Sequence, residues 1–338
     1  MRSANPRVLI FAALVAACVA AGVVAILSAS SSGGADPTPA AAPTARQAFA
    51  AAAAKHTPML LFRSLDRKRP KTYGQVALAP LGGSPVARAL VPLRCERVDF
   101  EAGHGICLSR GTGFASGYRA KIFGPDFRIA HEVKVAGVPS RARVSLDGRI
   151  GSVTLFVSGH SYAEQGTFST QTTFIDLVSG RRIGDLEHFA VTLDGRRVTA
   201  RDRNYWGATI AADGDTFYAT LATNKRTYLI TGSIRARSAH AIHENVECPS
   251  LSPDETRIAY KKRVGSGTKI WHLHVLDLTT MHETPLAEER PIDDQVEWLS
   301  GDRVLYRVDE EIWTAAADGS GLPARYKTAG ESPSVVRW

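Results

Sequence analysis

The chain reads ECPSLSPDETRIAYKKR from residue 247 to 263, KIWHLHVLDL from 269 to 278 and HETPLAE from 282 to 288. Apolar and polar residues alternate in these segments, and Pro253-Asp254 interrupts them, a pattern typical of short strands joined by tight turns. We expect one strand to end at Ser252, two more to cover 258–262 and 270–276, and an outer one to lie near Pro285. This unit predicts a four-stranded antiparallel sheet.

The same order of strands and turns recurs, with different residues, over 143–177, 206–243 and 294–316. Asp147, Asp213 and Asp254 occupy equivalent places, and we assign them to tight turns without chemistry. The 280 residues from Met59 to Trp338 divide into six such units of about 47 residues. Repeats of this length with four strands each are typical of a β-propeller, so the sequence predicts an all-β fold with six blades.

The end of the sequence predicts how the ring closes. Residues 331–338 repeat the opening of the unit at Glu247, but the chain stops before a second strand. The segments 59–65, 75–81 and 86–93 have the character of the missing second, third and fourth strands. We therefore expect the C-terminal strand to complete the first blade, which leaves no strand edge open there.

Leu251-Ser252-Pro253-Asp254-Glu255, followed by Arg257-Ile258-Ala259-Tyr260, resembles the repeats of TolB-like, or WD40-like, β-propeller proteins, as does 313–319. The resemblance is good over about 245–320, weaker over 140–245, and rests on pattern alone before that. It implies an exported or membrane-anchored protein of the bacterial envelope. Because this fold serves scaffolds, sensors and enzyme accessory domains, the resemblance is specific for fold and weak for function.

The N-terminal residues predict export. Arg2 and Arg7 precede an apolar segment, Val8 to Ala29, that is long enough to span a bilayer. We expect residues 1–29 to be a transmembrane signal anchor with its N-terminus inside, although a cleaved signal peptide or acylation of Cys18 is also compatible with the sequence. Residues 30–57, rich in Ala, Pro, Ser and Gly, then form a tether with a short helix around 46–55, and 58–338 form an extracytoplasmic propeller.

Charge and cysteine content narrow the partners. The formal charge of +8 comes from 41 basic and 33 acidic residues. The basic residues are interleaved with acidic ones rather than clustered, which argues against nucleic acid. The four cysteines lack the spacing of a zinc site. In an oxidising compartment Cys95 and Cys107 can form a disulfide around a turn at Gly103 and Gly105, which leaves Cys248 single.

The face at which the innermost strands of a propeller begin is the default binding site, because loops that are distant in sequence converge there. This reasoning selects acidic, amide and aromatic side chains of three units: Asp202, Asn204, Tyr205, Trp206, Asn245, Glu247, Asp293, Asp294 and Glu297. They could line a pocket for a cation, an amine or a sugar, with Tyr205 or Trp206 as a stacking platform. Alternatively, the Asp and Asn side chains only satisfy backbone donors at strand starts.

The sequence lacks the motifs of common enzymes. It has no Gly-X-Ser-X-Gly elbow, no phosphate-binding glycine loop and no His-Glu-X-X-His helix. His272 and His274 share a strand face, but no third zinc ligand is near in sequence. We therefore expect a binding or scaffold module for an envelope protein or glycan, without cofactor or catalysis. The alternative is a hydrolase or lyase that uses acidic residues at the mouth of the channel.

Overall fold

The computed structural model describes residues 44–111, 117–157, 169–265 and 271–338. By its contacts the chain forms two units, Met1–Pro43 and Thr44–Trp338, and the description below concerns the second. No helix in the described ranges is long and apolar enough to cross a membrane. The expected anchor, residues 1–29, and the first part of the expected tether lie outside these ranges.

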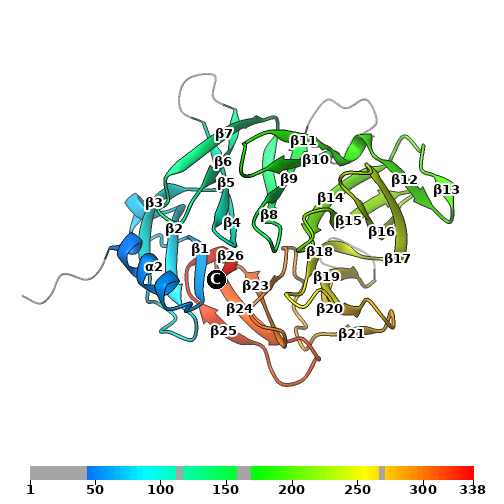
Figure 1. Cartoon of the computed structure of the whole chain (residues 1–338). Helices are drawn as coiled ribbons and strands as arrows, with labels where there is room; N and C mark the ends of the chain where they lie inside the picture. The colour runs from blue at the N-terminus through cyan, green and yellow to red at the C-terminus, as the bar shows by residue number, and fades with distance from the viewer. Residues whose placement is uncertain (1–43, 112–116, 158–168, 266–270) are drawn as a thin grey trace, which may run out of the picture. The chain divides into compact units, whose positions relative to one another are not determined.

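Six antiparallel sheets form the blades of a ring, as the sequence predicts (Figure 1). The innermost strands of blades 1 to 6 are β26, Gly330–Val336; β4, Arg97–Glu101; β8, Val138–Val144; β14, Asn204–Ile210; β18, Glu247–Leu251; and β22, Glu297–Trp298. Each of them contacts the innermost strands of both neighbouring blades. We call the side on which these strands begin the top face and the side on which they end the bottom face.

The outer strands of blades 1 to 3 follow in chain order. Blade 1 adds β1, Met59–Ser64; β2, Gln75–Pro80; and β3, Ala89–Arg94, with a 3₁₀ turn η1 at Pro70–Thr72. Blade 2 adds β5, His104–Arg110; β6, Tyr118–Phe123; and β7, Ile129–Val135. Blade 3 adds β9, Ile150–Val157; β10, Ser169–Asp176; and β11, Arg182–Asp185.

Blades 4 to 6 are built in the same way. Blade 4 adds β15, Thr216–Thr223; β16, Arg226–Ser233; and β17, Ser238–Glu244. Blade 5 adds β19, Arg257–Arg263; β20, Trp271–Asp277; and β21, Glu283–Pro285. Blade 6 adds β23, Arg303–Val308; β24, Glu311–Ala316; and β25, Ala324–Lys327.

The C-terminal strand closes the ring as predicted. Strand β26 pairs with β1, so that Met59 lies opposite Val336 and Arg63 opposite Glu331. The hydroxyl of Ser334 accepts a hydrogen bond from the backbone N–H of Phe100 at 3.0 Å, which ties β26 to blade 2. Because β26 supplies the inner edge of blade 1, the two ends of the propeller sequence stabilise one sheet.

The turns inside the blades repeat one local design. In Ser145-x-Asp147, Ser252-x-Asp254 and Ser300-x-Asp302 the serine hydroxyl donates to the aspartate carboxylate two residues later. Asp213 accepts the backbone N–H groups of Asp215 and Thr216, both at 2.8 Å. The assignment of Asp147, Asp213 and Asp254 to turns is therefore confirmed.

One hairpin is added to the expected plan, and one helix is found where the sequence predicts it. A hairpin of β12, Ala190–Leu193, and β13, Arg196–Arg197, follows the 3₁₀ turn η2, Leu186–His188, and extends blade 4 because β12 pairs in parallel with β17. Helix α2, Ala45–Ala54, is the short helix expected there, and a capping box of Thr44 and Gln47 begins it.

Helix α2 is part of the propeller rather than of a tether. Its Phe49 is fully buried, with ring centroids 5.3 Å from Phe100, 4.9 Å from Phe127 and 4.8 Å from Trp338. The compact unit thus begins at Thr44, not at residue 58. The alanine-rich composition concealed this, because one aromatic side chain carries most of the contact.

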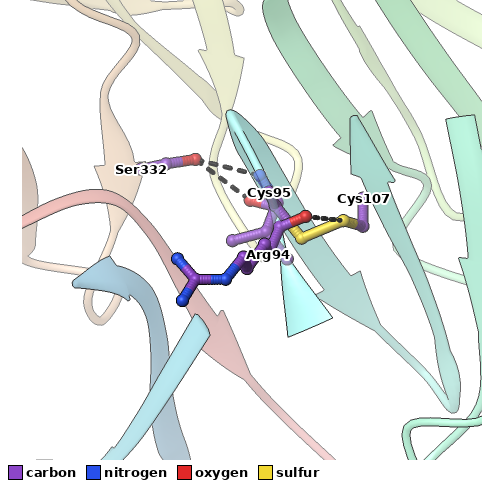
Figure 2. The surroundings of a disulfide bond; sticks show 5 residues. Arg94, Cys95, Cys107 and Ser332 are labelled. Carbon is purple, nitrogen blue, oxygen red and sulfur yellow. Dashed lines mark hydrogen bonds between the residues drawn. A yellow bond between two sulfur atoms is a disulfide. The ribbon is translucent and has the colours of Figure 1, made fainter. Parts of the chain in front are cut away.

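The predicted disulfide is confirmed. Cys95 and Cys107 are bonded, with their Cα atoms 5.4 Å apart, while Cys248 is a free, buried cysteine. Cys95 lies between β3 and β4, so the bond fastens the connection of blades 1 and 2 to strand β5. Figure 2 shows Ser332 beside the disulfide, and its hydroxyl bonds to the backbone N–H and C=O of Val98 at 3.2 Å each. This arrangement fixes the backbone at the start of β4.

Candidate functional site

A cavity of about 620 Å³ opens on the top face. It lies at the starts of β26, β4 and β8 and at the adjoining loops, so blades 1, 2, 3 and 6 build it. Its walls combine basic, acidic and apolar side chains: Arg63, Leu65, Tyr73, Glu96, Arg97, Arg110, Tyr118, Val138, Pro139, Arg307, Asp309, Glu310 and Glu331. We call this cavity the top pocket.

One buried carboxylate organises the basic wall of the top pocket. Glu331 is 4% exposed and accepts hydrogen bonds from the guanidinium groups of Arg63 and Arg307. The guanidinium of Arg97 lies 3.8 Å from the same carboxylate. Three strands position these arginines, because Arg63 ends β1, Arg97 begins β4 and Arg307 is near the end of β23. The second carboxylate at this wall is Glu96, whose Oε2 lies 3.0 Å from Arg63 Nη2.

One arginine of the wall retains a donor that no described residue satisfies. Arg63 Nε is buried and has no hydrogen-bond partner in the described ranges. Arg97 donates from Nε to the carbonyl of Ser140 at 2.6 Å and from Nη1 to that of Glu96 at 3.0 Å. Burial lowers the pKa of Arg97, since desolvation outweighs the nearby carboxylates. An anion at this place would compensate both deficits.

The rim of the top pocket is apolar and aromatic. Val138 is 54% exposed beside Pro139 at the start of β8. The Tyr73 ring lies 5.6 Å from the Arg63 guanidinium, and Arg110 donates to the Tyr118 hydroxyl at 3.4 Å. Apolar contact area around a few charged donors is typical of a site that binds an organic ligand or a peptide segment.

None of the residues selected from the sequence lines the top pocket, and one of them, Glu297, lies at the bottom cavity instead. Asp293 is bonded to Lys261 at 2.5 Å, and Asp294 lies 3.7 Å from Arg141. Glu247 is paired with Arg263 at 3.1 Å.

The remaining polar candidates bind backbone groups. Asp202 accepts the N–H of Asn224 at 2.6 Å, Asn204 accepts that of Thr170 at 3.0 Å, and Asn245 exchanges bonds with the backbone of Arg263. Such bonds are those expected if these side chains only complete strand starts.

Three candidates lie away from the surface on which a ligand was expected. Tyr205 is 1% exposed and Trp206 7%, so neither ring can serve as a stacking platform. Tyr205 alternates into the core of blade 4, where it joins Phe174 and Phe217. Glu297 is buried deeper in the ring and bonded to Arg143 at 2.8 Å. Burial raises the pKa of this carboxyl.

Sequence reasoning selected residues near the starts of the innermost strands but did not select the arginines of the top pocket. The inward direction of Arg63 and Arg307 depends on the register of second strands, which repeats of low similarity do not fix. A usable signal existed at Glu96-Arg97, because these charged residues follow Cys95 and begin an innermost strand. Their position beside the predicted disulfide indicates a rigid place on the top face.

The bottom face has a different composition. There a cavity of only about 30 Å³ lies among Asp99, Glu101, Glu297, Arg143 and Arg337. Asp99 lies 3.4 Å from Arg143 and Glu101 lies 3.6 Å from Arg337. Burial raises the pKa of Glu101 to about 8, although Arg337 acts in the opposite direction. The space admits little more than water, so we do not consider it a ligand site.

The described residues contain no cluster of three side chains that could hold a metal ion. His274 packs beside Tyr260, with ring centroids 5.9 Å apart, and burial lowers the pKa of its imidazole.

Similarity to known proteins is found in structure only. No family model matches the sequence, and none of the curated proteins is significantly similar to it. TolB from Acinetobacter baumannii aligns with 82% of this chain and 66% of its own, at 16% identity and a TM-score of 0.53. A chain of a nidogen/laminin complex aligns over 82% of this chain and 98% of its own, at 11% identity and a TM-score of 0.56. The described chain thus has the fold of a TolB-like six-bladed β-propeller.

Proposed function

We propose that the protein is a non-catalytic binding module of the cell envelope and that the top pocket holds part of a protein partner. The observation that carries this proposal is the top pocket itself, in which the buried, unpartnered Nε of Arg63 lies in a cavity whose rim includes the exposed Val138 and two partly exposed tyrosines. Propellers commonly bind ligands at this face. The similarity to a chain of a nidogen/laminin complex is in keeping with such a role but shows only the fold.

We further propose that the propeller is extracytoplasmic and tethered by residues 8–29. Support comes from the basic residues Arg2 and Arg7 before a long apolar segment. The disulfide Cys95–Cys107 agrees with an oxidising compartment. If the segment is instead cleaved as a signal peptide, the same domain is secreted.

The absence of catalysis is also a proposal. The acidic residues considered for a hydrolase or lyase are engaged: Asp293 with Lys261, Asp294 with Arg141 and Glu247 with Arg263. A general acid and base need a reacting group within reach, and these carboxylates face cations instead. Turnover of a glycan or lactone that disappears in Asp293→Ala/Asp294→Ala would favour the enzyme.

Site-specific crosslinking tests the binding proposal. A photoreactive amino acid is placed at Tyr118, on the rim of the top pocket, in the full chain expressed in its host. The matched control carries the same group at Leu322, which is 88% exposed and does not line the top pocket. We expect one dominant protein adduct from position 118 and none from 322, identified by mass spectrometry. Equal labelling at both positions, or a glycan adduct at 118, would contradict a protein partner at this pocket.

A further inference from the structure

The side chain of Glu96 occupies the position that an external anion would need. Its carboxylate is 3.0 Å from Arg63 Nη2, and the side chain is 42% exposed. The side chain of Glu331, which also contacts Arg63, is 5% exposed and bonded to two arginines. Of these two acids Glu96 is the one that reaches solvent, and if its side chain turns away, Arg63 remains bonded to Glu331.

The backbone of Glu96 is fixed while its side chain is not. The preceding Cys95 is bonded to Cys107, and the N–H of Glu96 donates to the carbonyl of Leu108 at 2.6 Å. The carbonyl of Glu96 accepts from Arg97 Nη1 at 3.0 Å. A rotation of the side chain alone would therefore expose Arg63 and leave the rest of the wall in place.

Charge and geometry select the incoming group. Four arginines and four acidic residues line the top pocket: Arg63, Arg97, Arg110 and Arg307 with Glu96, Asp309, Glu310 and Glu331. A single carboxylate that takes the place of Glu96 on Arg63 keeps this balance, whereas a phosphate dianion would exceed it. The planar guanidinium fork matches a carboxylate, and both acids already bound there are carboxylates. The apolar rim of Val138, Tyr73 and Tyr118 suits the side chains of a peptide rather than a bare ion.

We infer that the top pocket takes a carboxylate of a peptide and that this carboxylate replaces Glu96 on Arg63. The inference rests on the proposed function, since it names the group that the partner inserts. The carboxylate is either a chain terminus or an acidic side chain. Glu96 is then a competitor within the protein, so its removal should strengthen binding.

The test measures peptide binding by the full chain in detergent. Pentapeptide pools of Ala, Leu, Tyr and Gln carry an uncharged fluorophore at the N-terminus and are followed by fluorescence anisotropy. One pool ends in a free carboxylate, a second is amidated, and a third is amidated but contains one Glu. Inorganic phosphate and acetate are the competitors. The variants are Glu96→Gln, Arg307→Gln and, as an exposed control outside the top pocket, Arg325→Gln, whose guanidinium pairs with Glu311.

We expect the first or third pool, but not the second, to bind. Glu96→Gln should tighten binding about two- to five-fold, the scale of a partly exposed ion pair. Arg307→Gln should weaken it more than about tenfold, while Arg325→Gln should have no effect. Unchanged thermal midpoints of the variants exclude misfolding as the cause, and Arg97→Lys, which keeps the charge but loses the fork, should also weaken binding.

Three outcomes would overturn the inference. They are equal binding of the amidated pool, displacement of peptide by phosphate at lower concentration than by acetate, and weaker or unchanged binding by Glu96→Gln. A protein adduct at Tyr118 together with no peptide binding would reject the carboxylate but retain the proposed function. Loss of the adduct itself would reject both.

Discussion

The top and bottom faces of the ring differ in the size of their cavities and in the balance of charge around them. At the top, four arginines and four acidic residues line a cavity of about 620 Å³. At the bottom, Asp99, Glu101 and Glu297 outnumber Arg143 and Arg337 around a cavity of about 30 Å³. The bottom can remove its excess charge internally by keeping a proton on Glu101. Arginine cannot lose its proton in the physiological range, so the arginines at the top are balanced by carboxylates and not by titration.

The largest effect should follow from a deletion that disrupts the top and bottom faces at once. Deletion of Glu331–Trp338 removes the hub of the top arginines together with Arg337 and the inner strand of blade 1. We expect the loss of cooperative unfolding, or a thermal midpoint lower by more than about 10 °C. Circular dichroism during heating measures this. A deletion variant with an unchanged midpoint would refute the closure of the ring by β26.

The substitution Glu331→Gln should disrupt the ion pairs of the top face alone. The substitution leaves Arg63, Arg97 and Arg307 without their buried counter-charge, which costs about 3–5 kcal/mol of unfolding free energy. Urea denaturation measures the cost, with Glu311→Gln as the control, because Glu311 pairs with Arg325 at the surface. A cost below about 1 kcal/mol would mean that the top cluster is as weakly coupled as a surface pair.

The double substitution Cys95→Ser/Cys107→Ser should affect the top face but not the bottom face. The bond closes a short loop, so its removal should cost about 3 kcal/mol. Because Cys95 precedes Glu96 and Arg97, binding at the top should also weaken, while the pH dependence set by the bottom stays the same. If the pH dependence changed and binding did not, the disulfide would stabilise the bottom face rather than the top face.

The most gradual effect is expected from the titration of the bottom face, because it develops over several pH units. The folded chain holds the proton of Glu101 up to about pH 8, because burial raises its pKa from 4.5, whereas the unfolded chain loses it near 4.5. Stability should therefore fall as pH rises from about 4.5 to 8.

Glu187, whose pKa is also raised to about 8 by burial, adds to the same slope. Glu101→Gln should thus flatten the slope only in part and should make the protein more stable than wild type at pH 9. Urea denaturation between pH 5 and 9 measures this. A wild-type slope retained in full by the variant would show that Glu101 does not carry the proton.

Sequence reasoning predicted the propeller, its closure and the disulfide, because turns and alternation are local signals that recur in every blade. It failed where the proposed function depends on the direction in which a side chain points. Asp293 and Asp294 are paired with Lys261 and Arg141, which come from distant parts of the sequence. Tyr205 occupies a core position, since one step along a strand exchanges surface for interior.

The pairing of β26 with β1 has a further consequence for biogenesis. Met59 cannot find Val336 until nearly the whole sequence has been synthesised. Until then blade 1 lacks its inner strand, and the arginines that pair with Glu331 lack their buried carboxylate. Contacts between such distant parts of a chain form late in folding. If the chain crosses a membrane during synthesis, its propeller would therefore remain unclosed throughout translocation. The top pocket would form only after the C-terminal strand has emerged.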